Sequence, residues 1–113
     1  MLLRFMYYSP FLAAIIMLEL NPAQRKYLKG LAHNLKPVVM IGNAGLTEAV
    51  LKEIGKSLAA HELIKIRVLN DNREEREAWL QAICEAVGCA PVQHIGKLLL
   101  VYKPADKPQI KLP

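Results

Sequence analysis

The sequence predicts an α/β domain, a two-layer sandwich in which helices pack on a four-stranded mixed sheet. Three stretches with helical periodicity alternate with short strand-like runs, which gives the order α-β-α-β-α-β-β along the chain. The chain has 113 residues, of which 53% are apolar. That is enough for one domain with a modest core and too little for two.

The first helix is expected to begin at Asn21 and Pro22, with Asn21 as the N-cap and Pro22 at the first helical position. It is expected to end near Ala32. Its apolar side is formed by three residues, Tyr27, Leu28 and Leu31. Pro37 excludes any further helix, so residues 37–41 are expected to form a short apolar strand.

The second helix is expected over residues 47–60. Apolar residues recur every four positions, the spacing of a core-facing stripe: Leu46, Val50, Ile54 and Leu58. The next strand is expected over residues 63–69. Its residues alternate, so Ile64, Ile66 and Val68 should face the core. Lys65 and Arg67 should form a basic surface on the other side.

The third helix is expected to begin at Asp71, which with Glu74 resembles a capping box, and to end at Val87 before Gly88. Its inward side consists of Trp79, Leu80, Ile83, Cys84 and Val87. Strands over residues 91–95 and 98–102 are expected to form a hairpin, because two residues separate them. Residues 103–113 contain three prolines and are expected to form a tail.

Residues 1–16 differ from the rest of the chain. Arg4 is their one charged residue, and residues 5–18 are nearly all apolar. This run is shorter than the roughly 20 apolar residues that span a bilayer, and Pro10 interrupts it. A signal peptide and a membrane tether stay open as alternatives. We expect instead that translation starts at Met17, so that residues 17–113 form the single domain.

The chemistry of the side chains does not indicate an enzyme. The three histidines, His33, His61 and His94, fall in separate elements and form no HExxH or Ser-His-acid pattern. Cys84 and Cys89 lack the further ligands of a zinc site and are expected to be buried, reduced thiols. We therefore expect no catalysis, no metal and no cofactor.

The segment Gly42-Asn43-Ala44-Gly45 joins an expected strand to an expected helix. Glycines let the main chain approach a ligand, and a helix N-terminus favours phosphate. KH domains hold nucleotides with a GxxG loop of this kind. The alternative is an ordinary turn that needs one positive φ. Because Asn43 and Ala44 are uncharged, an anion would be held by backbone N–H groups, and any base preference must arise elsewhere or from RNA shape.

Basic residues flank this loop in a chain whose net charge is +5. Such a charge permits an anionic partner without requiring one. No acidic residue lies between Glu19 and Glu48. This interval holds the cations that we expect near the loop: Arg25, Lys26, Lys29 and Lys36. Weaker candidates follow the loop: Lys52, Lys56, Lys65 and Arg67. For any one lysine, solvation alone is the competing explanation.

Five ordered segments carry a family resemblance: residues 29–33, 35–39, 41–48, 61–66 and 95–97. Together they resemble the CRM domain (chloroplast RNA splicing and ribosome maturation), in particular its bacterial single-domain YhbY-type members. The resemblance covers about residues 18–112. It implies a fold similar to the C-terminal domain of translation initiation factor three, no known catalysis, and RNA contact through Gly42 to Gly45.

The resemblance implies a cytoplasmic RNA-binding protein that associates with precursors of the large ribosomal subunit and assists ribosome assembly. The loop and the basic residues agree with this expectation. The rival interpretation is a protein-interaction module that docks on ribosomal proteins or on itself without RNA contact. Binding of the purified protein to protein-free ribosomal RNA distinguishes the two.

Overall fold

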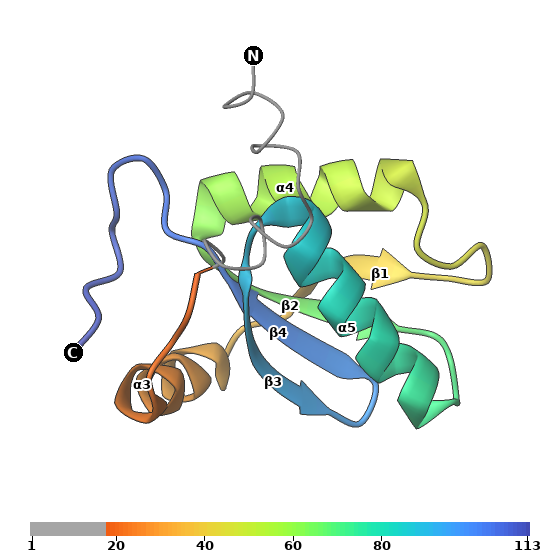
Figure 1. Ribbon diagram of the computed structural model, residues 1–113, viewed down its shortest axis with the longest axis horizontal. Helices are drawn as coiled ribbons and strands as arrows, with labels where there is room; N and C mark the ends of the chain where they lie inside the picture. Colours follow the sequence, from red (N-terminus) through yellow and green to blue (C-terminus); the bar gives the residue numbers. More distant parts are fainter. Residues whose placement is uncertain (1–17) are drawn as a thin grey trace, which may run out of the picture.

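A computed structural model describes residues 18–113 (Figure 1). The expectations for residues 1–16 and for a start at Met17 lie outside the described residues. The elements are helix α3 (Pro22–Ala32), strand β1 (Pro37–Ile41), helix α4 (Glu48–His61), strand β2 (Leu63–Val68), helix α5 (Arg73–Val87), strand β3 (Ala90–Ile95) and strand β4 (Leu98–Tyr102). The predicted order α-β-α-β-α-β-β is confirmed.

The four strands form one mixed sheet in the order β1-β2-β4-β3, as predicted for the fold class. Strand β1 pairs with β2 in parallel, since α4 carries the chain back between them. The pairs β2–β4 and β3–β4 are antiparallel. The hairpin turn of β3 and β4 consists of Gly96 and Lys97, as expected from the spacing.

Helices cover both faces of this sheet. Helices α4 and α5 pack on one face, where Ile54, Leu58 and Ile83 meet Ile64 and Ile66 of β2. Helix α3 packs on the opposite face and contacts β2, β3 and β4 (Figure 1). The molecule therefore has a third layer, and the expectation of two layers is incomplete.

The second core, under α3, explains the additional layer. It is formed by Leu28 and Ala32 of the helix together with sheet residues that include Leu63, Leu100 and Tyr102. The alternation in β2 predicted a basic surface on this side, and Lys65 and Arg67 do lie there. Leu63, at the start of the strand, is nevertheless buried beneath α3. The helix contacts the sheet through a narrow stripe, so Tyr27 and Leu31 are exposed.

The helix ends follow the cap residues, with one correction. Asn21 caps α3 and forms a capping box with Gln24. Gly88 ends α5 in the left-handed region at φ 77°. The sequence predicts Asp71 as the N-cap of α5, and this prediction is wrong. The N-cap is Asn72, whose Oδ1 accepts the Glu75 N–H at 2.9 Å.

Candidate functional site

The GxxG loop, residues 42–45, is a tight turn between β1 and α4. The Gly45 N–H donates to the Gly42 carbonyl oxygen at 3.0 Å. Gly45 has φ 77°, and a Cβ there would lie 3.5 Å from the Trp79 ring. Gly42 has no positive φ, and a Cβ there would meet nothing within 4 Å. Gly45 therefore serves the turn, whereas Gly42 leaves free space beside the main chain.

The N-terminus of α4 follows this turn directly. Thr47 is its N-cap, and its Oγ1 accepts the Val50 N–H at 3.1 Å. The remaining first-turn N–H groups have no partner within the helix, by the general geometry of helix ends, and they carry the positive end of the dipole. Asn43 and Ala44 are exposed in front of it. Glu48 adds a carboxylate in the first turn, so an anion here depends on backbone N–H groups and nearby cations.

Two of the candidate cations lie toward the loop: Lys52 on α4 and, on the opposite face of the sheet, Arg67. Lys52 and Lys56 are exposed on α4, roughly 6 and 12 Å along the helix axis from Glu48. Arg67 is exposed near the end of β2 and pairs with Met40, two residues before the loop. Lys65 is half-buried and pairs with Pro37, at the start of β1 and away from the loop. Lys52 and Arg67, which the sequence analysis gave as weaker candidates, are therefore nearer to the loop than Lys36.

The structure does not gather Arg25, Lys26, Lys29 and Lys36 beside the loop. Lys36 lines a groove with His61, the last residue of α4, whereas the loop precedes the first residue of that helix. A helix of 14 residues is about 21 Å long, which sets the separation. Helix α3 lies away from the loop in Figure 1, although Lys29 in its last turn lines a hollow with Ile95 and Leu98. Strand β1 runs between Lys36 and the loop, so residues that are close in sequence lie at opposite ends of an extended strand.

The basic residues also differ in how free their charges are. Arg25 is half-buried, and its guanidinium donates to the Leu20 carbonyl oxygen at 3.3 Å. Within residues 18–113 the ion pairs are Lys97 with Asp71 and His94 with Glu77, so none of the eight candidate cations takes part in one. Of the seven other candidates, six are exposed and Lys65 is half-buried.

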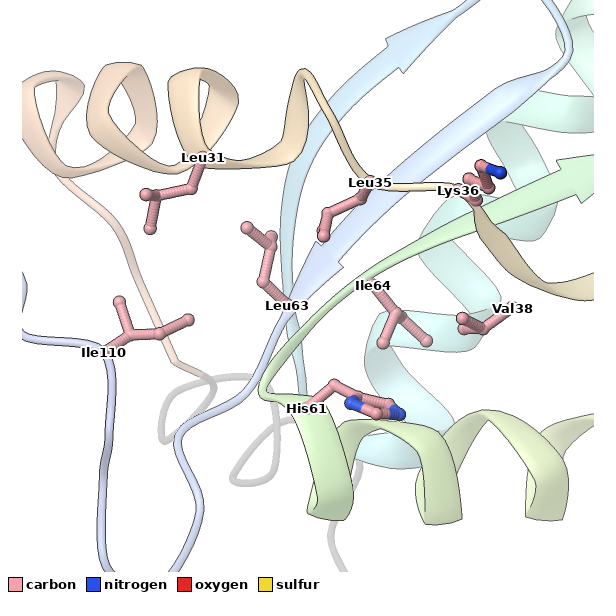
Figure 2. A pocket seen from close by; sticks show the side chains of 8 residues that line it. All are labelled: Leu31, Leu35, Lys36, Val38, His61, Leu63, Ile64 and Ile110. Carbon is pink, nitrogen blue, oxygen red and sulfur yellow. The ribbon is translucent and has the colours of Figure 1, made fainter.

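An apolar groove of about 440 Å³ opens at the end of the molecule opposite the loop (Figure 2). Its walls come from the end of α3, the start of β1, the α4–β2 junction and the C-terminal tail. The lining residues are Leu31, Leu35, Lys36, Val38, His61, Leu63, Ile64 and Ile110. Most are aliphatic, so the groove suits an apolar surface better than a phosphate.

Sequence reasoning missed Glu62, a buried carboxylate between α4 and β2. Its oxygens accept the backbone N–H groups of Ala105, Gln109 and Ile110, each at 2.9 Å. These bonds, led by that from Ala105, hold the pKa of Glu62 below its ordinary value despite burial. The partners lie more than 40 residues away, so local patterns could not show them. Glu62 fixes the tail that forms one wall of the groove.

The two cysteines are free and fully buried, with 3.8 Å between their sulfur atoms. Contact with Cys89, together with burial, raises the pKa of the Cys84 thiol. Among the described residues, no group of three or more His, Cys, Asp or Glu side chains is placed to hold a metal ion. Over the same residues, no helix has the length and apolar character needed to cross a bilayer.

Several known proteins have sequences similar to this chain. The chain is 46% identical to an RNA-binding protein of Haemophilus influenzae, over 86% of this chain and 98% of the other. It is 40% identical to a "Probable RNA-binding protein" of Pseudomonas aeruginosa, over 84% and 91%. It is 33% identical to the "Probable RNA-binding protein YqeI" of Bacillus subtilis, over 83% and 99%.

A solved structure shares the fold. It is the solution structure of a hypothetical protein of Staphylococcus aureus, described there as a candidate RNA-binding protein. The TM-score is 0.75 at 34% identity, covering 84% of this chain and 100% of the other. The model of the CRS1/YhbY (CRM) domain matches residues 20–103. The chain thus belongs to the CRM domain family.

Proposed function

We propose that this chain is a cytoplasmic RNA-binding protein that associates with precursors of the large ribosomal subunit and assists their assembly. The relatives described above carry the names of RNA-binding proteins rather than of enzymes. The ribosomal part of the proposal rests on the resemblance of the ordered motifs to YhbY-type members of the family. RNA is the partner, and no small-molecule substrate or cofactor is involved.

The observation that carries the proposal is the GxxG loop at the N-terminus of α4. Its middle residues, Asn43 and Ala44, are exposed, and no Cβ blocks access at Gly42. Backbone N–H groups at a helix start bind phosphate without reading bases. Lys52 in α4 and Arg67 near the end of β2 supply charge near the loop. We therefore assign RNA-backbone contact to the loop, and longer-range attraction to these cations.

A direct binding assay tests the proposal. Purified protein should bind protein-free ribosomal RNA, and the affinity should fall as salt rises, because neutralising each phosphate of a single strand contributes about 0.7 to the slope of log K against log salt. A flat salt response would count against a backbone contact. In cells, crosslinking followed by RNA sequencing should recover large-subunit precursor RNA. Recovery of messenger RNA alone would remove the ribosomal part of the proposal.

A second candidate function is docking on a protein, and the groove in Figure 2 favours it. Its lining is aliphatic apart from Lys36 and His61. Under this alternative the purified chain would bind ribosomal proteins or itself and would not bind protein-free RNA. Changing Leu31 and Leu35 to serine would then abolish the interaction with the protein partner.

A further inference from the structure

The sheet face that carries α3 is only partly covered by that helix. The strand pairings arrange this face in rows that run across the sheet. Leu63 pairs with Tyr102, which pairs with Ala90, and this row is buried under α3. Four residues further along β2, at the end near the loop, Arg67 stands on the same face. The coverage by α3 therefore ends before the sheet does.

The uncovered row crosses all four strands. Met40 of β1 pairs with Arg67 of β2, Arg67 pairs with Leu98 of β4, and Leu98 pairs with Ile95 of β3. We call these four residues the open row. Met40 is 55% exposed and Ile95 is 52% exposed, more than any other large apolar side chain among the described residues. One guanidinium thus sits in a row of apolar side chains, of which Met40 and Ile95 are exposed and Leu98 is half-buried.

The open row is continuous with the GxxG loop. Met40 is followed by Ile41 and then by the first glycine of the loop. The Ile41 carbonyl oxygen accepts the Leu69 N–H at 2.8 Å, which joins the ends of β1 and β2 beside the loop. A strand of RNA whose backbone contacts the loop is thereby placed next to this row.

The charges beside the open row suit RNA. Behind it, a shallow hollow of about 90 Å³ is lined in part by Lys29, His33 and Lys65. Two carboxylates near the β3–β4 hairpin have close partners: Asp71 is 2.6 Å from Lys97, and Glu77 is 2.6 Å from His94. No acidic residue stands in the row itself. The row with its surroundings is a cationic, partly apolar platform.

We propose that the open row contacts the unstacked bases of single-stranded RNA whose backbone is held by the GxxG loop. This inference rests on the proposed function, and it supplies the base contacts that an uncharged backbone loop cannot make. Sheet faces bind RNA in this manner in other folds, where bases stack on aromatic or guanidinium planes. Here Arg67 provides the plane, and the thioether of Met40 provides a polarisable apolar contact with an aromatic ring.

The experiment compares variants of the full chain on two probes of equal length, an oligouridylate and an oligomer of the same backbone without bases. Met40→Ser with Ile95→Ser should weaken oligouridylate binding about fivefold, since base contacts are lost. The salt slope should stay unchanged, since no cation is removed. Binding of the abasic oligomer should stay at the wild-type level. The matched control is Leu31→Ser with Leu35→Ser, two exposed apolar residues at the far end.

Arg67→Lys separates charge from stacking. It keeps the cation but removes the planar group, so oligouridylate affinity should fall while the salt slope is retained. Thermal unfolding midpoints establish whether the variants fold. We expect them to fold, because the substituted residues are exposed.

Three results would overturn the inference, and they are distinguishable. If wild-type protein binds no RNA, the proposed function fails as well. If the open-row variants bind oligouridylate like the control while a loop variant binds weakly, the function stands and the open row is not a base contact. If the open-row variants lose self-association in light scattering but keep RNA affinity, the row is a protein interface.

Discussion

Among single residues, the two glycines of the loop have different physical roles. Gly45 adopts φ 77°, where an L-residue is strained, and Gly42 does not. We predict that Gly45→Ala lowers the free energy of unfolding by about 1 kcal/mol, because of the backbone conformation rather than the 3.5 Å approach to Trp79. Gly42→Ala should leave stability unchanged or slightly higher. Urea unfolding measures both.

The same pair separates folding from RNA contact. If the main chain at Gly42 approaches phosphate, a methyl group there should weaken RNA binding without loss of stability. Equal stability losses in the two alanine variants would contradict the different roles assigned to the glycines. Unchanged RNA affinity of Gly42→Ala would contradict close approach at that residue.

Glu62 gives a pH-dependent contribution to stability. Its pKa in the folded protein is below its ordinary value of 4.5, so the native state binds fewer protons than the unfolded state. The stabilisation of the folded protein by ionised Glu62 is fully present when the pH is above the ordinary pKa. It is lost as the pH falls through the lower pKa of the folded state. We predict that Glu62→Gln costs about 2 kcal/mol at neutral pH, from the loss of hydrogen bonds to a charged acceptor.

The measurement is urea unfolding from about pH 7 to pH 3. The difference in unfolding free energy between wild type and Glu62→Gln should shrink as the pH falls. Glu85→Gln, an exposed change on α5, is the control and should stay within about 0.5 kcal/mol of wild type. A difference that is constant with pH would contradict the role of the ionised carboxylate.

Among the secondary-structure elements, the start of α5 shows how a local pattern can select the wrong cap. Asp71 and Asn72 are both suitable N-cap types. The carboxylate of Asp71 instead binds Lys97, which belongs to the distant β3–β4 hairpin, and the hydrogen bond from Lys97 lowers the pKa of Asp71. Asn72 remains to cap the helix. Only the tertiary arrangement distinguishes the two residues.

This correction leads to a prediction for the cap. Asn72→Ala should lower the free energy of unfolding by about 1 kcal/mol, because the Glu75 N–H loses its acceptor. Asp71→Ala should leave it close to the wild-type value, since an exposed ion pair contributes little. Thermal unfolding followed by circular dichroism compares them. A larger loss of unfolding free energy for Asp71→Ala than for Asn72→Ala would contradict the assignment of Asn72 as the N-cap.

For the molecule as a whole, the order of elements could be predicted from the sequence because each element carries its own signal. Four-residue spacing marked α4, alternation marked β2, and a two-residue gap marked the hairpin. The side of the sheet on which α3 packs carries no such signal, because an amphipathic helix fits either face. The third layer could therefore not be predicted from the sequence. The burial of Leu63 beneath α3 could not be predicted either, because it depends on that layer.

The candidate site could be predicted in part for the same reason. The GxxG loop is local, so its turn and the following helix start could be inferred from residues 37–50. The grouping of the cations depends on where strands begin and end. Lys36 is six residues from Gly42 in the chain, yet an extended strand of five residues, about 17 Å, lies between them. Residues remote in sequence, such as Arg67, are nearer to the loop.

The affinity of a loop variant for protein-free ribosomal RNA tests the central claim most directly. Asn43→Asp with Ala44→Asp places two carboxylates at exposed positions in front of α4, where they would repel phosphate. The control, Lys107→Gln with Lys111→Gln, changes the net charge equally at exposed tail positions. Backbone contact at the loop predicts an affinity loss of about tenfold or more for the loop variant, with the control close to wild type and both folded. Equal affinities for the loop variant and the control would contradict the claim.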